Sequence, residues 1–367
     1  MKATATSEQI QEAARAIREG RLVVFPTETV YGLGADALNE GAVSRIYAAK
    51  ERPPDNPLIV HLASIDRIPR VVRSLAPLAS ALFARFAPGP LTLVLPAHAD
   101  LPRIVTAGLD TVAVRIPRHP VARAFLEACG GPVAAPSANR SGEPSPTTLD
   151  MARASLEHGA QPAAGPDAAS RVALRGIRYL DGGPCEVGLE STVAAVTDHD
   201  IVILRPGAIS ASDLRDAAPG VAVREAGAHD EGGLTRSPGR VHRHYHPRAT
   251  VVLHDPAREN TDDLKALLGS VAGPGTAPVA VIGVGSSIDA PSAAARAWQA
   301  ACCGVDGRDF DAVVTRRATD VAGYARDLYR WFTELDAAGA GCIVAVLPAD
   351  HGIGRAVRDR LQRASTG

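Results

Sequence analysis

The stretch Lys-Glu-Arg-Pro-Pro-Asp-Asn-Pro-Leu-Ile-Val-His, residues 50–61, joins a predicted helix to a predicted strand. Asn39 suits the N-cap of the helix, and apolar side chains then follow at helical spacing, so Lys50 and Arg52 come at the helix end. Prolines hold the next residues extended. Residues 58–60 form a short buried strand that brings His61 to its carboxyl end, where open α/β sheets keep their ligands. We therefore expect two cations and a histidine at one rim of an α/β sheet.

Lys50 and Arg52 have two interpretations. In the first they only complement the negative end of the helix dipole, which contributes at most about 1 kcal/mol. In the second they bind a phosphate group. Of the 39 basic residues only Lys2, Lys50 and Lys265 are lysine. A lysine at this rim favours a compact point charge for a phosphate oxygen, beside the planar fork of Arg52, although the sequence alone leaves both interpretations open.

The composition is that of a globular protein with more than one domain. A chain of 367 residues is long for a single core, and 46% of its residues are hydrophobic and 22% charged. The net charge of -1 gives no overall attraction to nucleic acid or membranes. Five cysteines without a C-x-x-C pair argue against a disulfide framework, and no signal peptide or membrane span is apparent. We expect a cytoplasmic protein.

Periodicity and turn signals divide the chain into residues 1–217, a linker at 218–247 and residues 248–367. The first part predicts helices at 8–19, up to residue 50, at 75–86, at 120–129 and one capped by Thr147; it predicts strands at 22–25, 58–60, 91–95, 111–116, 133–135, 177–180, 191–196 and 201–204, with a loop at 26–34. The last part alternates strands at 250–253, 279–284, 312–315 and 342–347 with helices at 262–268, 292–302 and 321–335. That alternation predicts a smaller parallel sheet covered by helices.

Several polar groups stand at predicted strand ends. The period of two places Arg115 on the face opposite Val112 and Val114, where it is either a solvated edge charge or a ligand clamp. The loop at 136–145 is rich in hydroxyls, which fits ordinary turn chemistry as well as a ligand site, and no G-x-S-x-G elbow makes Ser137 a nucleophile. Ser191 begins the predicted strand 191–196, and Arg205 follows the predicted strand 201–204.

Two other patterns resemble cofactor or metal sites, but each lacks a feature that such a site requires. Gly32-x-Gly34 resembles a dinucleotide fingerprint, but six residues separate it from the preceding strand, whereas the fingerprint requires a glycine directly after the strand. The histidines 242, 244 and 246 alternate, yet no nearby carboxylate or cysteine completes a ligand set. We therefore expect neither a nicotinamide cofactor nor a metal held by protein ligands alone.

The chain resembles the YrdC-type threonylcarbamoyl-adenylate synthase family in its long, two-domain form. The resemblance is carried by Phe25-Pro-Thr-Glu-Thr-Val-Tyr-Gly-Leu-Gly34, Lys50-x-Arg-Pro-x-x-Asn-Pro-Leu-Ile-Val-His61, Pro88-Gly-Pro-Leu-Thr92, Ala107-Gly-Leu-Asp-Thr-Val-Ala-Val-Arg115, Ala135-Pro-Ser-Ala-Asn139, Glu190-Ser-Thr192 and Leu204-Arg-Pro-Gly207. It implies a YrdC-like twisted mixed sheet with helices, followed by a smaller Rossmann-like α/β domain.

The resemblance also implies a nucleotidyltransferase that combines L-threonine, bicarbonate and ATP into threonylcarbamoyl-adenylate and pyrophosphate. The product would pass to a threonylcarbamoyl transferase that modifies the adenosine beside the tRNA anticodon, and a weak tRNA contact of the enzyme itself would fit. Threonine would be held by Thr27, His61, Arg115 and Ser191. ATP would be held by Lys50 and Arg52, taken as the catalytic cations, and by Asn56, Thr111, Ala135, Ser137, Asn139, Ser145, Arg205 and His242.

In long members of the family the linker folds back over the site, and Ser237-Pro-Gly239 with His244-Tyr245 resembles that segment. This chain has His242 where the family usually has a tyrosine, and Glu51, which we expect to face solvent, where a small residue is common. Mg²⁺ would be bound mainly through the ATP phosphates, because it prefers phosphate and water oxygens. Two alternatives are a carbamoyltransferase of the same fold and a non-catalytic RNA-binding module.

Overall fold

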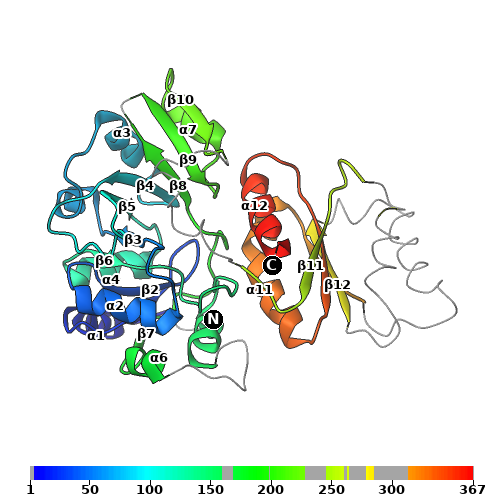
Figure 1. Ribbon diagram of the computed structural model, residues 1–367, viewed down its shortest axis with the longest axis horizontal. Coiled ribbons are helices and arrows are strands. Elements are labelled where there is room, and N and C mark those ends of the chain that lie inside the picture. The colour runs from blue at the N-terminus through cyan, green and yellow to red at the C-terminus, as the bar shows by residue number, and fades with distance from the viewer. Residues whose placement is uncertain are drawn as a thin grey trace. The chain divides into compact units, whose positions relative to one another are not determined.

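The computed structural model describes residues 4–158, 168–197, 199–227, 245–259, 263, 278–284 and 313–366. The chain divides into two compact units, Met1–His242 and Arg243–Gly367 (Figure 1). Within the described residues, every helix is too short or too polar to cross a membrane.

The first unit is built on a ten-stranded mixed sheet in the order β10-β9-β8-β4-β5-β3-β6-β2-β1-β7. The sheet contains both parallel pairs, such as β3 with β5, and antiparallel pairs, such as β4 with β5, which confirms the predicted mixed α/β sheet. The strands are β1 Val23–Phe25, β2 Gly32–Asp36, β3 Ile59–His61, β4 Leu91–Pro96, β5 Thr111–Arg115, β6 Val133–Ala134, β7 Arg178–Tyr179, β8 Thr192–Val196, β9 Asp200–Arg205 and β10 Ala222–Glu225.

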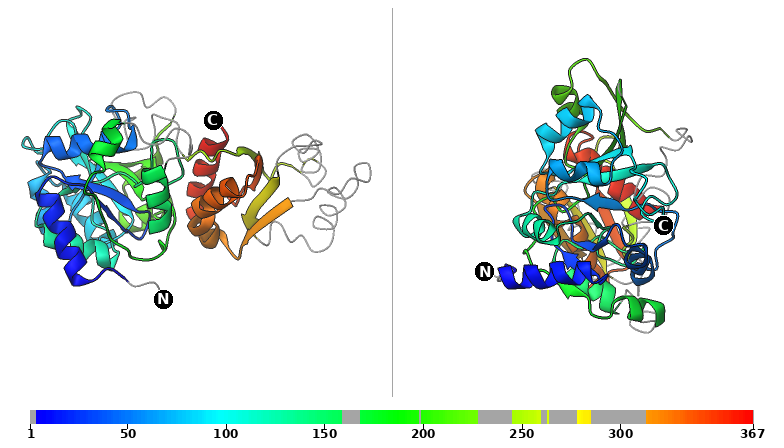
Figure 2. Two further views of the ribbon diagram at one scale, coloured as in Figure 1. Left: turned by 90° about the horizontal axis from the view of Figure 1, so that it is seen from below. Right: turned by 90° about the vertical axis from the view of Figure 1, so that its left-hand side faces the viewer.

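Helices cover both faces of this sheet (Figures 1 and 2). One face packs its core against α2 and α3, and the other packs against α1 and α4, which lie side by side. A capping box of Thr6 and Gln9 begins α1, and the αL residue Gly130 ends α4. The helices are α1 Ser7–Arg18, α2 Glu40–Lys50, η1 Ile65–Arg70, α3 Pro77–Phe86, α4 Pro120–Cys129, α5 Leu149–Arg153, η2 Ala154–His158, α6 Ala168–Ala173 and α7 Ala211–Ala217.

The structure differs from the sequence prediction at β2, β10 and one helix cap. Residues 32–34 belong to β2 rather than to a loop. The glycines that suggested a loop are instead required by packing, since a Cβ on Gly34 would lie 2.8 Å from Val133 Cγ1. β10 lies within the segment predicted as linker; as a largely exposed edge strand it carries no apolar alternation. Thr148, not Thr147, caps α5, since its side chain accepts from Met151 N. The sequence also does not predict α7.

The second unit contains a parallel sheet, as predicted. Its strands lie in the order β11-β14-β12-β13. Its elements are β11 Thr250–His254, β12 Val279–Val284, β13 Val313–Ala318, α11 Val321–Ala337, β14 Cys342–Val346 and α12 Ile353–Ser365. The sequence does not predict α12. The helices predicted at 262–268 and 292–302 lie outside the described residues, apart from residue 263.

Candidate active site

The candidate site begins with a row of polar side chains across three neighbouring strands. In the parallel pair β3 and β5, His61 lies opposite Arg115, and in the antiparallel pair β4 and β5, Thr92 lies opposite Arg115. Residues that are directly opposite in a sheet project from the same face. Apolar Val112, Val114 and Ile116 fill the core on the other face. Of the two interpretations of Arg115, the structure rules out the solvated edge charge, since the side chain is buried.

Arg115 is only 3% exposed, and three groups hold its guanidinium. Nη2 lies 2.8 Å from Glu28 Oε1, Nη1 donates to Thr29 Oγ1 at 2.8 Å, and Nε donates to the Gly89 carbonyl at 3.3 Å. Burial raises the pKa of the Glu28 carboxyl, but the Arg115 charge and several hydrogen bonds outweigh burial and hold that pKa below its usual value. Glu28 and Arg115 thus form a buried ion pair.

His61 lies beside this ion pair in an apolar environment. Its ring meets the Phe25 ring edge-on, with centroids 5.8 Å apart, and its Nδ1 lies 3.2 Å from the Ile59 carbonyl oxygen. Burial and the neighbouring Arg115 charge lower the pKa of His61 to about 3. The imidazole is therefore neutral at pH 7 and adds no charge to the site.

The hydroxyls of Thr27 and Thr29 lie in a row next to Arg115. Thr27 Oγ1 donates its proton to the Val30 carbonyl at 2.6 Å, accepts from the backbone N–H groups of Thr29 and Val30 at 3.2 Å, and lies 2.9 Å from Thr29 Oγ1. Thr29 in turn accepts from Arg115. The Thr27 hydroxyl, predicted to contact threonine, is therefore engaged within its own turn in this structure.

Ser191 and Arg205 meet at the end of β9. Arg205 donates from Nε and Nη2 to the Ser191 carbonyl at 3.2 and 3.1 Å, and from Nη2 to Ser191 Oγ at 3.3 Å. Ser191 Oγ also lies 2.8 Å from Thr92 Oγ1, which connects it to the strand row that contains Arg115. A hydroxyl and a second buried guanidinium thus extend the site beyond β4.

Lys50 lies at the end of α2, as predicted, and is buried with a relative exposure of 1%. Its Nζ donates to the carbonyls of Ser137, at 2.6 Å, and Asn139. Burial, together with the charge of Arg52, lowers the pKa of this ammonium well below its usual value. An ammonium has three protons, so these two hydrogen bonds leave one further donor.

Further residues predicted to bind ATP make their own contacts within the fold. Arg52 donates to the carbonyls of Asn56 and Pro57 at 3.3 and 3.1 Å. Ala135 N donates to the Ile59 carbonyl, and Thr111 begins β5 and is partly exposed. Buried Ser145 donates to Glu190 Oε1 at 2.5 Å.

Asn139 has a defined amide orientation. Its Nδ2 donates at 2.8 Å to the carbonyls of Arg140 and Glu143, so the side-chain oxygen must point the other way. That buried Oδ1 has no hydrogen-bond partner within the described part of the chain. An orphaned buried acceptor is costly, which suits an atom that meets a ligand.

Backbone hydrogen bonds bring three loops of the site together. Tyr31 N donates to the Pro146 carbonyl, Ala138 N to the Tyr31 carbonyl, and Ser141 N to the Lys50 carbonyl. These bonds link the end of α2 to the loop at 136–146, and that loop to Tyr31. His242 lies outside the described residues, along with the linker motif Ser237-Pro-Gly239 and His244. Glu51 is exposed, as expected, and pairs with Arg140.

Sequence reasoning missed Glu28, Thr29, Thr92 and Glu190. The only local signal for Glu28 is an acidic residue within a stretch that is otherwise apolar and hydroxyl-bearing. Nothing local points to its partner, since Arg115 lies far along the chain and the two residues meet only through the fold.

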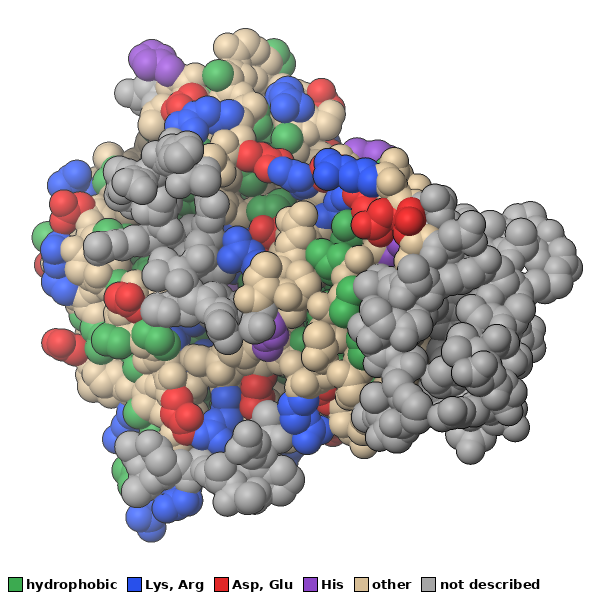
Figure 3. Space-filling model, turned by 45° about the vertical axis from the view of Figure 1, so that its right-hand side comes forward, with side chains coloured by type: hydrophobic (Ala, Val, Ile, Leu, Met, Phe, Trp, Pro, Cys, Tyr) green, Lys and Arg blue, Asp and Glu red, His purple; other side chains and the backbone are tan. Residues whose placement is uncertain are grey.

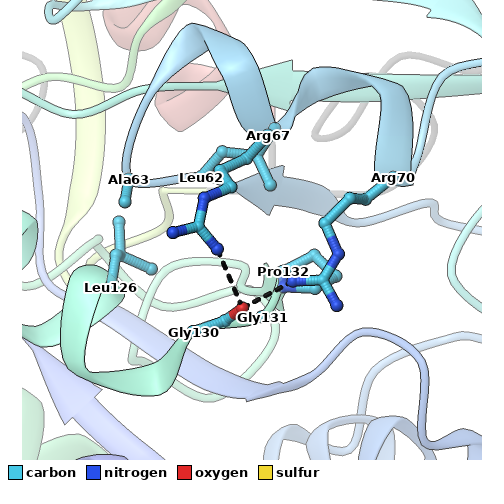
Figure 4. Close-up of a pocket in the computed structure, with 8 residues that line it drawn as sticks. All are labelled: Leu62, Ala63, Arg67, Arg70, Leu126, Gly130, Gly131 and Pro132. Carbon is cyan, nitrogen blue, oxygen red and sulfur yellow. Dashed lines mark hydrogen bonds between the residues drawn. The ribbon is translucent and has the colours of Figure 1, made fainter.

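A small pocket lies apart from these residues, at the end of α4 (Figure 4). Arg67 and Arg70 both donate to the Gly130 carbonyl, at 3.3 and 2.5 Å. Because helix ends leave carbonyls unpaired, these arginines cap α4. On the face seen in Figure 3, basic and acidic side chains are interspersed among the described residues.

Comparison with known proteins identifies the family. A family model described as "Telomere recombination", covering Sua5, YciO and YrdC proteins, matches residues 15–207, and a second, described as "Threonylcarbamoyl-AMP synthase, C-terminal domain", matches residues 209–366. The chain belongs to the threonylcarbamoyl-AMP synthase family. It has the long, two-domain form, which confirms the family predicted from the motifs.

Members of this family are similar along nearly the whole chain. The threonylcarbamoyl-AMP synthase of Pyrococcus abyssi is 38% identical over 97% of this chain and 94% of its own length, and that of Bacillus subtilis is 38% identical over 98% and 93%. The crystal structure of P. abyssi Sua5 complexed with L-threonine superposes with a TM-score of 0.79 at 35% identity, covering 98% of this chain and 95% of the other.

Proposed function

We propose that the chain is an L-threonylcarbamoyladenylate synthase, a nucleotidyltransferase that forms threonylcarbamoyl-AMP and pyrophosphate from L-threonine, bicarbonate and ATP. The observation that carries the proposal is the family membership of both units, together with 38% identity to two threonylcarbamoyl-AMP synthases over nearly the full length. The product would supply the threonylcarbamoyladenosine modification of tRNA through a separate transferase.

The charges of the site suit the two substrates. Arg115, with His61 and Ser191 nearby, offers a fixed guanidinium and hydroxyl donors to a hydroxy amino acid, and a guanidinium pairs well with a carboxylate. Lys50, Arg52 and Arg205 supply cations for the triphosphate. The neutral imidazole of His61 can lie near a substrate ammonium without repelling it.

The reaction needs positioning and charge stabilisation more than a covalent nucleophile. The threonine amine and bicarbonate give a carbamate and water, one carbamate oxygen attacks the α-phosphate, and pyrophosphate leaves. Lys50 and Arg52 would stabilise the charge that moves onto the phosphate oxygens, and the chain of hydrogen bonds from Arg115 to Thr27 would keep threonine fixed during the attack.

Mg²⁺ bound with ATP would neutralise part of the phosphate charge. The residues fit this role: Asn139 Oδ1 is a buried, orphaned hard oxygen near Lys50, suited to the hydrated ion or to the nucleotide. The carboxylates of Glu28 and Glu190 are engaged with Arg115 and Ser145, so the metal would be held mainly by phosphate and water.

Product analysis by mass spectrometry tests the function. Incubation of the full chain with L-threonine, bicarbonate, ATP and Mg²⁺ should give threonylcarbamoyl-AMP and one pyrophosphate per product. A carbamoyltransferase would instead form a carbamoylated product from carbamoyl phosphate without requiring threonine, and a non-catalytic RNA-binding module would form none of these and bind RNA with a steep salt dependence. The net charge of -1 argues against the last alternative.

A further inference from the structure

We infer that Glu28 and Thr29 are positioning residues that fix the guanidinium of Arg115 for the α-carboxylate of the amino acid substrate. The inference rests on the proposed function, in which Arg115 binds threonine. It concerns two neighbouring residues between β1 and β2 that touch Arg115 from one side.

Glu28 is too fully engaged to bind substrate itself. Oε1 lies 2.8 Å from Arg115 Nη2, and Oε2 accepts from the backbone N of Arg118 at 3.0 Å. The side chain is 1% exposed, and its backbone carbonyl accepts from Val187 N at 2.8 Å. A carboxylate anchored at both oxygens and at its own backbone holds the neighbouring guanidinium rather than a ligand.

The contacts of Arg115 fix the plane of the guanidinium. Thr29 accepts one proton of Nη1 and Gly89 the proton of Nε, while Glu28 Oε1 holds Nη2 as an ion-pair partner at 2.8 Å. At least one N–H remains on each terminal nitrogen. Two donors on a fixed plane match the two oxygens of a carboxylate, whereas a free guanidinium would lose side-chain freedom each time it bound one.

Thr29 is in turn placed by Thr27. Their hydroxyl oxygens lie 2.9 Å apart, and Thr27 Oγ1 also accepts from Thr29 N at 3.2 Å. A guanidinium has no acceptor, so Thr29 Oγ1 accepts from Arg115 Nη1. The hydroxyl at position 29 therefore acts only as an acceptor toward the guanidinium. Valine at this position would keep the shape and remove the acceptor.

Titration calorimetry of the full chain with L-threonine and with L-threonine amide tests the inference. The amide keeps the ammonium and hydroxyl but lacks the carboxylate. In Glu28→Gln we expect threonine affinity to fall by about tenfold and amide affinity to change by less than about twofold, so that the preference for the carboxylate is lost. Thr29→Val should lower threonine affinity by about fivefold, the effect of one hydrogen bond.

Two controls separate positioning from folding. Glu186→Gln makes the same chemical change in an exposed residue that pairs with Arg118, and it should leave both affinities unchanged. ATP affinity should stay within about twofold of wild type in all three variants. If the affinities for threonine and its amide fell equally, Glu28 would be an ammonium ligand and the inference would be overturned. A simultaneous loss of ATP affinity would also overturn it, because it would indicate a folding defect.

Unchanged or tighter threonine binding in Glu28→Gln would also overturn it, because Glu28 would then act only as a competing counter-ion. The two proposals fail separately. A wild-type chain that prefers threonine to its amide but makes no adenylate refutes the proposed function alone. A chain that makes adenylate, with Glu28→Gln and Thr29→Val binding threonine normally, refutes the positioning roles alone.

Discussion

His61 and Arg115 lie directly opposite each other on the parallel strands β3 and β5, and the histidine stays neutral beside the buried cation. Each strand was placed by its own apolar pattern, but only their pairing puts the two side chains on one face. The neutral ring follows from that pairing, since both burial and the Arg115 charge disfavour a proton on the imidazole.

This arrangement predicts how stability depends on pH. Unfolded histidine has a pKa near 6.5, whereas the folded pKa of His61 is about 3, so the unfolded state binds more protons between these values. The stabilisation is fully present above pH 6.5 and is lost as the pH falls toward 3. Between pH 7 and pH 5, wild type should lose about 2 kcal/mol more unfolding free energy than His61→Gln.

Urea unfolding of both proteins at the two pH values measures this difference. The pKa of His119 is also lowered by burial, but that residue is present in both proteins and cancels in the comparison. The contribution of Glu28 appears only below its usual pKa of about 4.5 and lies outside the interval. Equal losses in the two proteins would show that His61 is protonated in the folded state.

Lys50→Met tests the role of the buried ammonium. Methionine keeps the apolar stem but leaves the Ser137 and Asn139 carbonyls without their donor and removes a cation from the phosphate site. We expect adenylate formation to fall by at least about tenfold, mainly through weaker ATP binding. Arg45→Met, an exposed residue on the same helix that donates to the Gly20 carbonyl, should leave turnover unchanged. Normal pyrophosphate release in Lys50→Met would contradict the assigned role.

Sequence reasoning succeeded where a signal is local. The period of two around Arg115 and the apolar run before His61 gave the strands and the face of each side chain. It failed where a residue is required by a contact with residues far away in the sequence. Gly34 gives its segment the composition of a loop, yet glycine is required there because Val133 and the Phe25 ring leave no room for a Cβ.

The same difference between local and distant signals explains why the sequence predicts only part of the site. Lys50 was predicted as a phosphate ligand, but its two carbonyl partners lie in a loop nearly ninety residues away, and no local pattern encodes them. Glu28 and Glu190 were missed because a buried carboxylate in a strand-like stretch is informative only when its partner is known.

Removal of the metal should separate the two substrate sites. Because the carboxylates of Glu28, Glu190 and Glu143 are engaged by Arg115, Ser145 and Ser155, we expect Mg²⁺ to enter with ATP. Excess EDTA should abolish adenylate formation while threonine affinity, measured by calorimetry, changes by less than about twofold. The Mg²⁺ concentration for half-maximal rate should rise with total ATP. Half-saturation that is independent of ATP would instead indicate a site built by the protein.

Gly207→Ala tests whether the loop after β9 must approach the Ser191 backbone. A Cβ at residue 207 would lie 2.3 Å from Thr192 N, 2.6 Å from the Ser191 carbonyl carbon and 2.8 Å from the Glu190 carbonyl oxygen. All three are backbone atoms, so no side chain can turn away. The loop must shift, and Arg205, which donates to the Ser191 carbonyl, must shift with it.

We therefore expect Gly207→Ala to lower the unfolding free energy of the first unit by about 1–3 kcal/mol and to raise the KM for ATP and threonine together. Gly131→Ala is the matched control, because a Cβ there would meet no atom within 4 Å. Calorimetric unfolding and steady-state kinetics of the two variants measure both effects. Wild-type stability and KM values in Gly207→Ala would mean that the Ser191 backbone and the loop are farther apart than in this structure, and the assignment of Arg205 to the nucleotide would lose its geometric basis.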